Sequence, residues 1–349
     1  MAPVHVLDKY YLSITLLVTI GYQLLGFAIA WTLQISPEAL FQHHISPDLS
    51  IRRSHPAILT LLIGNTFHTW NVVASVLVMV WATRLAGFLL FRVLKTGSDT
   101  RFDEIRSHFF KFFGFWVGQI LWVWTVSLPV TILNSPAVSD VSQGGSDPSF
   151  GTARDIIGII LWGIGWLIET VADAQKFRYK SSRPPKDRPT TIGIWSWSRH
   201  PPYFGEILCW WGIWTLCLSP TTNGSLPSSA RAAQYGSVVS PIFTFLILMF
   251  ASGVPTAEKP TAKKFYLLSH APADTDTTSA SRSPSRATYP DAWNKYKAYL
   301  NSTSILIPIP PVIYRPLPKI VKRTILLDWP IYQFDEVVDG KAARDEAGR

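Results

Sequence analysis

Long apolar stretches alternate with short polar segments along the chain. Six of them are long enough to be membrane helices: residues 11–33, 72–91, 112–133, 156–172, 203–218 and 236–252. An α-helix rises about 1.5 Å per residue, so roughly 20 apolar residues cross the hydrocarbon core of a bilayer. A shorter piece, residues 57–65, either extends the helix at 72–91 or forms a thin or re-entrant segment. The pattern predicts an all-α, polytopic membrane helical bundle of six or seven transmembrane helices.

The composition agrees with a membrane protein. Charged residues make up only 16% of the 349 residues, whereas a soluble domain usually has about 25%. A net charge of +9 also occurs in nucleic-acid-binding proteins, but here the basic residues lie next to the apolar stretches. Positive loops on the cytosolic side of a membrane explain that distribution better. We therefore expect a lipid membrane as the partner and no nucleic acid, and no obligate protein partner is evident.

The basic loops predict the orientation of the chain. Residues 92–111 and 173–199 are rich in Lys and Arg, and residues 134–153 contain neither. By the positive-inside rule, the basic loops and the C-terminus are cytosolic. Seven spans would place Arg52 and Arg53 on the cytosolic side, as the rule prefers, and six spans would place them in the lumen.

Three regions are expected. Residues 1–70 hold the divergent N-terminal membrane segment or segments, residues 71–311 the main membrane domain, and residues 312–349 a C-terminal cytosolic tail. Residues 270–289 are rich in Ser, Thr, Ala, Asp and Pro and are predicted to be a disordered insert. Residues 293–300 then carry aromatic and apolar side chains at helical spacing.

Prolines shape the end of the main domain. Proline occurs at positions 308, 310, 311, 316 and 318 and prevents further regular helix there. The apolar run 305–313 is therefore expected to lie on the membrane surface and not to cross the membrane.

The most informative polar residues stand where an apolar, Trp-rich stretch begins, in the sequence Ser-Arg-His-Pro-Pro-Tyr-Phe-Gly-Glu. Charge at that depth is costly unless it is paired or faces a polar cavity, so such residues are functional candidates. Tyr203 and Glu206 are three apart and project to one side of a helix as a donor and an acceptor. A carboxylate near a helix N-terminus also has a purely structural explanation. Arg199 and His200 lie just outside, where they would meet a phosphate or balance Glu206.

A second polar set follows the stretch at 156–172. Glu169 and Asp173 share one helix face, with Lys176 a further turn along. They form either an ion-pair ladder that fixes helix depth or a site that hydrogen-bonds the ribose or carboxamide of a cofactor. Four residues after the last stretch are either ordinary positive-inside charge or a clamp on cofactor phosphates: Lys263, Lys264, Tyr296 and Lys297.

Other chemistries find little support. The histidines between residues 43 and 68 have no carboxylate or cysteine partner at ligand spacing, and Cys209 and Cys217 lie in one stretch, so no metal is predicted. A soluble dinucleotide-binding fold is not supported either, because the chain has no Gly-x-Gly-x-x-Gly after a strand and no phosphate loop.

Together these motifs resemble the steroid 5-alpha-reductase-like membrane family, in its little-characterised branch of the domain-of-unknown-function type. The resemblance covers residues 71–311. Its carriers are Ser198-Arg-His-Pro-Pro-Tyr-Phe-Gly-Glu206 with Trp210-Trp211-Gly212, the spacing of Glu169, Asp173 and Lys176, Trp81-x-x-Arg84-Leu85, Ser252-Gly-Val-Pro255 with Glu258, and Tyr296-Lys297 with Thr303-Ser-Ile-Leu-Ile-Pro308.

The resemblance implies a helical bundle in the endoplasmic reticulum, with an NADPH cavity open to the cytosol. It implies hydride transfer to the conjugated carbon–carbon double bond of an enone, in a sterol or another hydrophobic lipid or isoprenoid-like substrate. By this similarity, Tyr203 and Glu206 would line the nicotinamide end. The residues implied to face ribose and phosphates are Arg199, His200, Lys263, Lys264, Tyr296 and Lys297.

The chain departs from the family at one telling position. The family motif usually has Asn where this chain has Pro202, and proline offers neither a side-chain amide nor a backbone donor.

The leading hypothesis is an NADPH-dependent reductase. One alternative is an S-adenosylmethionine-dependent methyltransferase resembling the isoprenylcysteine carboxyl methyltransferases, which share an Arg-His-Pro-x-Tyr-x-Gly element. The other is a non-catalytic member of the fold in which Pro202 has disabled the site.

Overall fold

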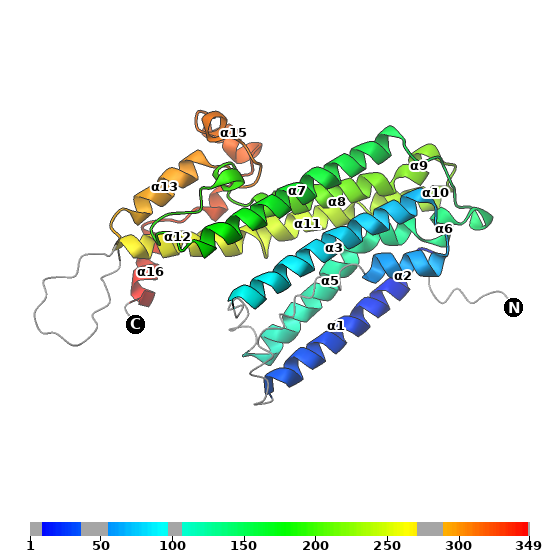
Figure 1. The fold of residues 1–349 in the computed structure, drawn as a ribbon, viewed down its shortest axis with the longest axis horizontal. Coiled ribbons are helices and arrows are strands. Elements are labelled where there is room, and N and C mark those ends of the chain that lie inside the picture. Colours follow the sequence, from blue (N-terminus) through cyan, green and yellow to red (C-terminus); the bar gives the residue numbers. More distant parts are fainter. Residues whose placement is uncertain (1–8, 36–54, 97–106, 271–288, 348–349) are drawn as a thin grey trace, which may run out of the picture. The chain divides into compact units, whose positions relative to one another are not determined.

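The computed structural model describes residues 9–35, 55–96, 107–270 and 289–347 (Figure 1). Within these residues the regular elements are helices, and the one β-bridge is an isolated parallel pair between Ser198 and Ser304. The chain forms two compact units. Unit 1 comprises Met1–Trp166 and Ile207–Thr244, and unit 2 comprises Leu167–Glu206 and Phe245–Arg349. The all-α prediction is confirmed for the described residues.

Five segments of the described chain are helical, long and apolar enough to cross a membrane: Leu12–Thr32, Thr69–Arg92, Phe109–Ser139, Ala153–Ser181 and Ser228–His270. They match five of the six predicted stretches, and the protein is an integral membrane protein. The sixth stretch forms α8 (Pro201–Cys217), whose 17 residues rise about 25 Å, near the lower limit for a span.

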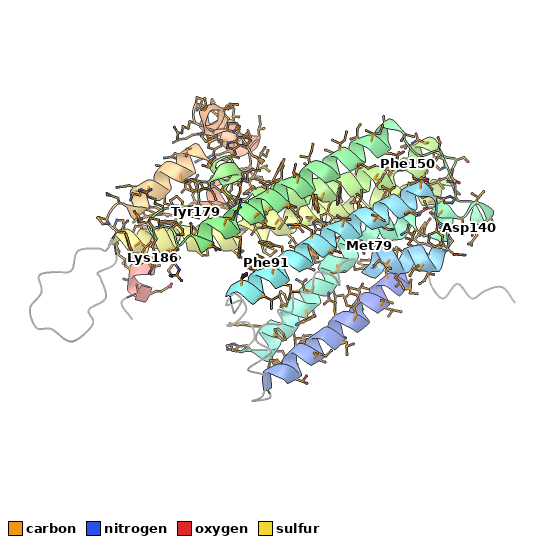
Figure 2. All side chains as sticks on the ribbon, in the orientation of Figure 1. Met79, Phe91, Asp140, Phe150, Tyr179 and Lys186 are labelled. Carbon is orange, nitrogen blue, oxygen red and sulfur yellow. The ribbon has the colours of Figure 1, made fainter. Side chains whose placement is uncertain are left out.

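Unit 1 contains α1 (Leu12–Ile35), α2 (His55–Gly64), α3 (Thr69–Thr96), α5 (Phe109–Leu133), α6 (Pro136–Ser139), η4 (Val141–Gln143), α9 (Ser219–Asn223) and α10 (Ser228–Gly236), with parts of α7 (Ala153–Ser181), α8 and α11 (Val239–Phe250). Large apolar side chains such as Leu17, Leu121 and Ile160 are exposed on these helices. Phe91 of α3 is another exposed apolar side chain (Figure 2). A helix in lipid needs no polar outer face, because lipid tails are as apolar as leucine.

The short apolar piece at 57–65 is a separate helix and does not extend α3. Asn65 adopts a left-handed φ of 49°, and residues 65–68 are not helical. Buried amides tie α2 to its neighbours: Asn71 Nδ2 donates to Asn134 Oδ1 (2.7 Å), and Asn134 Nδ2 donates to Thr60 Oγ1 (3.1 Å). Such side-chain bonds hold helices together where apolar burial offers little driving force.

Two glycines bring α7 and α8 into close contact inside unit 1. A Cβ on Gly158 would lie 2.8 Å from the backbone N of Leu216, and a Cβ on Gly212 would lie 2.6 Å from the backbone N of Trp162. Small residues at such crossings let two backbones approach each other. The glycine of the Trp-Trp-Gly motif is therefore required for the close packing of α8 on α7.

Unit 2 contains the rest of α7, η5 (Gly193–Ser196), the start of α8, the end of α11, α12 (Val254–His270), α13 (Ala292–Ser302), α14 (Pro311–Tyr314), α15 (Lys319–Thr324), η6 (Pro330–Tyr332) and α16 (Val338–Ala347). Helix α13 confirms the helical spacing at 293–300. Its Trp293 and Tyr296 form a buried cluster with Phe265 and Tyr266 of α12.

The C-terminal region, expected as a cytosolic tail, packs within unit 2. Phe334 packs on the Tyr266 ring (centroids 5.3 Å apart), and a Cβ on Gly340 would meet the same ring at 2.7 Å. The run 305–313 was expected on the membrane surface; Ile305 and Leu306 are instead buried in unit 2, whereas Val312 and Ile313 are exposed. The predicted insert lies, apart from its two end residues, outside the described residues.

Candidate functional site

The segment that leads into α8 is pinned by its backbone to residues 304–309. Arg199 N donates to Ser304 O (2.8 Å), Ile309 N donates to Trp197 O (3.1 Å), and Ser198 Oγ donates to Leu306 O (2.7 Å). The segment that contains the buried Ile305 and Leu306 thus holds the backbone of residues 197–199 in place. The backbone that bears the side chains of Arg199 and His200 is therefore held in place.

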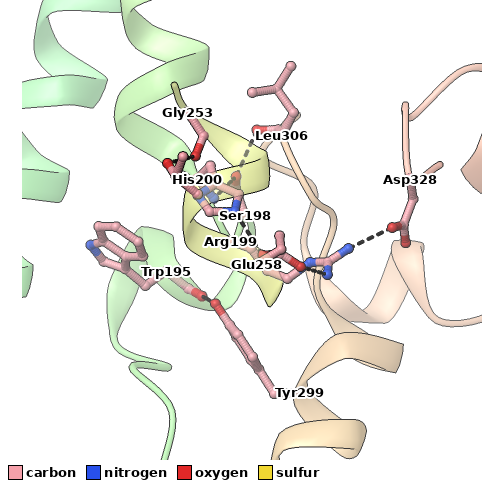
Figure 3. A network of polar contacts seen from close by, with 10 residues as sticks. Trp195, Ser198, Arg199, His200, Gly253, Glu258, Tyr299, Leu306 and Asp328 are labelled. Atoms are coloured by element: carbon pink, nitrogen blue, oxygen red, sulfur yellow. Dashed lines mark hydrogen bonds and ion pairs between the residues drawn. The ribbon is translucent and has the colours of Figure 1, made fainter. Parts of the chain in front are cut away.

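Arg199 and His200 enter a buried network of charges (Figure 3). Arg199 donates through Nη1 to Glu258 and through Nη2 to Asp328 Oδ1 (2.7 Å). His200 Nε2 lies 2.7 Å from the second Glu258 oxygen. Arg199 and Glu258 are only 7% and 5% exposed. Arg199 and the two carboxylates thus each face an opposite charge, as burial of a charge requires.

Asp328 also joins the network to α14. Its second oxygen accepts a hydrogen bond from the Tyr314 hydroxyl (2.7 Å). Burial, followed by the charge of Asp328, raises the pKa of Tyr314, so this hydroxyl stays a donor. Asp328 therefore bridges the motif at the start of α8 and the C-terminal region.

The protonation of His200 follows from its surroundings. Burial lowers its pKa, and the charges of Arg199 and Lys176 lower it further, whereas the hydrogen bond to Glu258 and the charge of Glu258 oppose the decrease. The ring is therefore neutral at pH 7, and because a carboxylate only accepts, Nε2 carries the proton. Burial disfavours the Arg199 cation, but Glu258 and Asp328 outweigh it and raise the pKa of Arg199.

We expect the protein to lose stability as the pH falls below 6.5, the ordinary pKa of histidine. The unfolded chain binds a proton at His200 before the folded chain does, so the contribution of neutral His200 is complete above that pH and is lost towards the lower folded pKa. Melting temperatures from about pH 8 to about pH 5 test this. The variant His200→Gln keeps an N–H donor and cannot titrate, so its profile should be flatter; coincident profiles would contradict the assignment.

Tyr203 stands on the His200 ring at the start of α8. The two rings are parallel, with centroids 5.1 Å apart and planes 6° apart. Tyr203 is half-buried, as is Glu206 less than one turn further along. Pro201 and Pro202 occupy the first two helical positions, where a missing N–H removes no helical bond. Pro202 is thus compatible with the backbone here.

Helix α7 packs against the same segment through Trp195. The indole Nε1 donates to Ala172 O (2.9 Å), and the Lys176 ammonium lies 4.1 Å from the indole ring centroid. Lys176 is also close enough to His200 to affect its pKa. Glu169 is buried and Asp173 half-buried on this part of α7.

The four residues predicted to bind cofactor phosphates lie in two different environments. Tyr296 is buried against Phe265 (ring centroids 4.7 Å apart), and its pKa is raised by burial and then by the charge of Glu258. Three lysines lie further out: Lys263 pairs with Glu346, Lys297 pairs with Glu336 (3.1 Å), and the Lys264 ammonium lies 5.8 Å from the Phe265 ring. The structure thus groups Tyr296 and Lys176 with Arg199 and His200, and it gives Lys263 and Lys297 carboxylate partners.

Sequence reasoning missed the two acids that hold Arg199. In the sequence, Glu258 stands out only as part of a motif, and Asp328 falls in the expected tail. A signal for Asp328 did exist, because it is the only acidic residue between positions 292 and 334. The described residues contain no group of three or more His, Cys, Asp or Glu that could hold a metal ion.

Comparison with known proteins places the chain in a family. The family model described as "Protein of unknown function (DUF1295)" matches residues 50–270, which includes Arg199, His200 and Glu258 but not Asp328. That family is related to steroid 5-alpha-reductase-like proteins. No curated protein and no solved structure gives a significant match. With nearly two thirds of its length matched, and with its apolar helices, the chain belongs to the DUF1295 family of membrane proteins.

Proposed function

We propose that the protein is a membrane-bound, NADPH-dependent reductase of a conjugated carbon–carbon double bond in a lipid such as a sterol. The observation that carries the proposal is the stacking of Tyr203 on His200, whose ring Glu258 holds in one orientation. A tyrosine so fixed, with Glu206 less than one turn away, is a positioned acid at the start of a membrane helix. The proposal includes the endoplasmic reticulum, with the site facing the cytosol.

The residues present fit a dinucleotide cofactor at its nicotinamide end. Tyr203 and Glu206 are both partly exposed and offer a hydroxyl donor and a carboxylate acceptor, which suit a carboxamide. Lys176, beside His200, would take a phosphate. Arg199 already donates to Glu258 and Asp328, so it holds the segment in place instead of binding a phosphate directly.

In this site NADPH would supply a hydride for the β-carbon of the enone. The Tyr203 hydroxyl, or a water held by Glu206, would hydrogen-bond the carbonyl oxygen, stabilise the negative charge that develops there and supply the proton that completes the reduction. The neutral His200 ring supports the Tyr203 ring from one face and, because Nε2–H is bound to Glu258, it does not rotate away.

We expect purified full-length protein in detergent to bind NADPH and to oxidise it only when a suitable enone is present. Glu206→Gln should lower the rate by about 100-fold or more, as loss of a positioned proton-transfer group does. Tyr203→Phe keeps the ring on His200 and should lower kcat with little change in KM. Asp345→Asn, an exposed change on α16, serves as the control and should have no effect.

The same experiment separates the competing functions. NADPH, NADH and S-adenosylmethionine are titrated side by side, and saturable binding of S-adenosylmethionine alone would select a methyltransferase. Absence of enone-dependent NADPH loss over a broad enone panel would contradict the reductase. If Pro202→Asn then created activity in an inactive native chain, the protein would be a non-catalytic member of the fold.

A further inference from the structure

The residues from 311 to 331, which we call the basic segment, expose an unusual number of aliphatic side chains. Val312 is 84% exposed and Ile320 66% exposed, and three more isoleucines are more than half exposed: Ile313, Ile325 and Ile331. They lie on α14, on α15, directly after α15 and on η6. An apolar surface of this kind marks an interaction site.

The basic segment carries a net positive charge. Its four cations are Arg315, Lys319, Lys322 and Arg323. Its one carboxylate, Asp328, already accepts hydrogen bonds from Arg199 and Tyr314. The Lys322 ammonium lies 4.3 Å from the centroid of the Tyr314 ring and donates to Arg315 O. No acid of the segment therefore neutralises its outer cations, which leaves them suited to an anionic partner.

The basic segment is attached to the end of α11, which lies within Ser228–His270, a segment long and apolar enough to cross a membrane. Trp329 stacks on Phe250, the last residue of α11, with ring centroids 5.2 Å apart. The Tyr332 hydroxyl, just after the segment, donates to Met249 O (2.7 Å). Both contacts are made at the point where α11 ends, and Trp and Tyr are enriched at the level where hydrocarbon meets headgroups. In a bilayer, this anchoring would put the aliphatic side chains and the cations at the membrane boundary if the apolar part of the span ends with α11.

We propose that the basic segment is a binding surface for anionic phospholipids of the bilayer that surrounds the protein. The exposed aliphatic side chains enter the boundary between acyl chains and headgroups, and the cations bind lipid phosphates and carboxylates, as in other interfacial amphipathic segments. The partner is a lipid headgroup and not a soluble phosphate, because free phosphate would leave the aliphatic side chains in water. The proposal does not depend on the reductase activity.

The test is equilibrium binding of short-chain phosphatidylserine to the full-length protein in neutral detergent, with phosphatidylcholine and inorganic phosphate as parallel probes. We expect saturable binding of phosphatidylserine only. Each cation near a membrane surface contributes a factor of about five in affinity, so Lys319→Gln with Arg323→Gln should weaken binding by about 25-fold. The matched control removes two exposed lysines elsewhere in unit 2, Lys186→Gln with Lys341→Gln, and should leave binding unchanged.

Three results would overturn the proposal. Equal weakening in the control would mean that net charge alone attracts the lipid. Comparable binding of inorganic phosphate would mean a phosphate site without lipid selectivity. Unchanged affinity in the double variant of the basic segment, with its fold verified by an unchanged melting temperature, would show that phosphatidylserine binds elsewhere.

Discussion

Replacing Glu258 by alanine should destabilise the protein strongly, far more than the loss of an exposed ion pair would. The substitution leaves the Arg199 guanidinium buried with Asp328 as its one remaining carboxylate, and it removes the partner of His200. Removing one member of a buried ion pair costs about 3–5 kcal/mol, because the remaining charge stays desolvated. Chemical or thermal unfolding of the purified protein in detergent measures the loss.

A surface ion pair offers the control for this experiment. Glu336 pairs with Lys297, and both side chains are more than 40% exposed, so Glu336→Ala should cost less than about 1 kcal/mol. The double variant Arg199→Met with Glu258→Met should lose less than the sum of the single variants, since neither charge is then left without the other. Similar losses for Glu258→Ala and Glu336→Ala would refute a buried network.

The second large effect is expected where α7 and α8 touch. Gly212→Ala should destabilise the protein by about 1–3 kcal/mol, because the new Cβ would meet backbone atoms and the helices would have to move apart. The nearest atoms are Trp162 N at 2.6 Å and Gly158 O at 2.7 Å. Unlike the end of a flexible side chain, a backbone cannot move aside cheaply.

A glycine on the neighbouring helix separates this effect from helix propensity. Gly163 on α7 has no atom within 4 Å of an added Cβ, so Gly163→Ala should be neutral or stabilising by up to about 1 kcal/mol. The two alanine variants are compared by melting temperature in the same detergent. Opposite signs are expected, and an equal gain in both would show that the helices are not in contact at Gly212.

The apolar stretches could be predicted from the sequence because a membrane helix depends mainly on length and composition. Five of the six predicted stretches match helical segments able to span a membrane, and α13 follows from the spacing of its aromatic residues. The position of the 57–65 piece could not be predicted, because it depends on the amide contact from Asn134 to Thr60, 74 residues apart.

The candidate site was only partly predictable. Tyr203 and Glu206 share a helix face by spacing alone, and Arg199 and His200 stand out as polar residues beside an apolar stretch. The partners of Arg199 are 59 and 129 residues away from it, and no local periodicity relates such positions. From the sequence, Arg199 was expected to face a phosphate or Glu206, which is the nearest carboxylate along the chain. In the structure its partners are Glu258 and Asp328.

The sequence by itself therefore determined the membrane class, most of the helices and the residues worth testing, since each follows from composition or from spacing within one helix. Only the tertiary structure decided which charges pair and that the C-terminal region completes the network. The physical reason is that a buried charge must find an opposite charge wherever the fold provides one. In this protein the fold provides it in α12 and at Asp328, a position that its neighbours in the sequence gave no reason to link to Arg199.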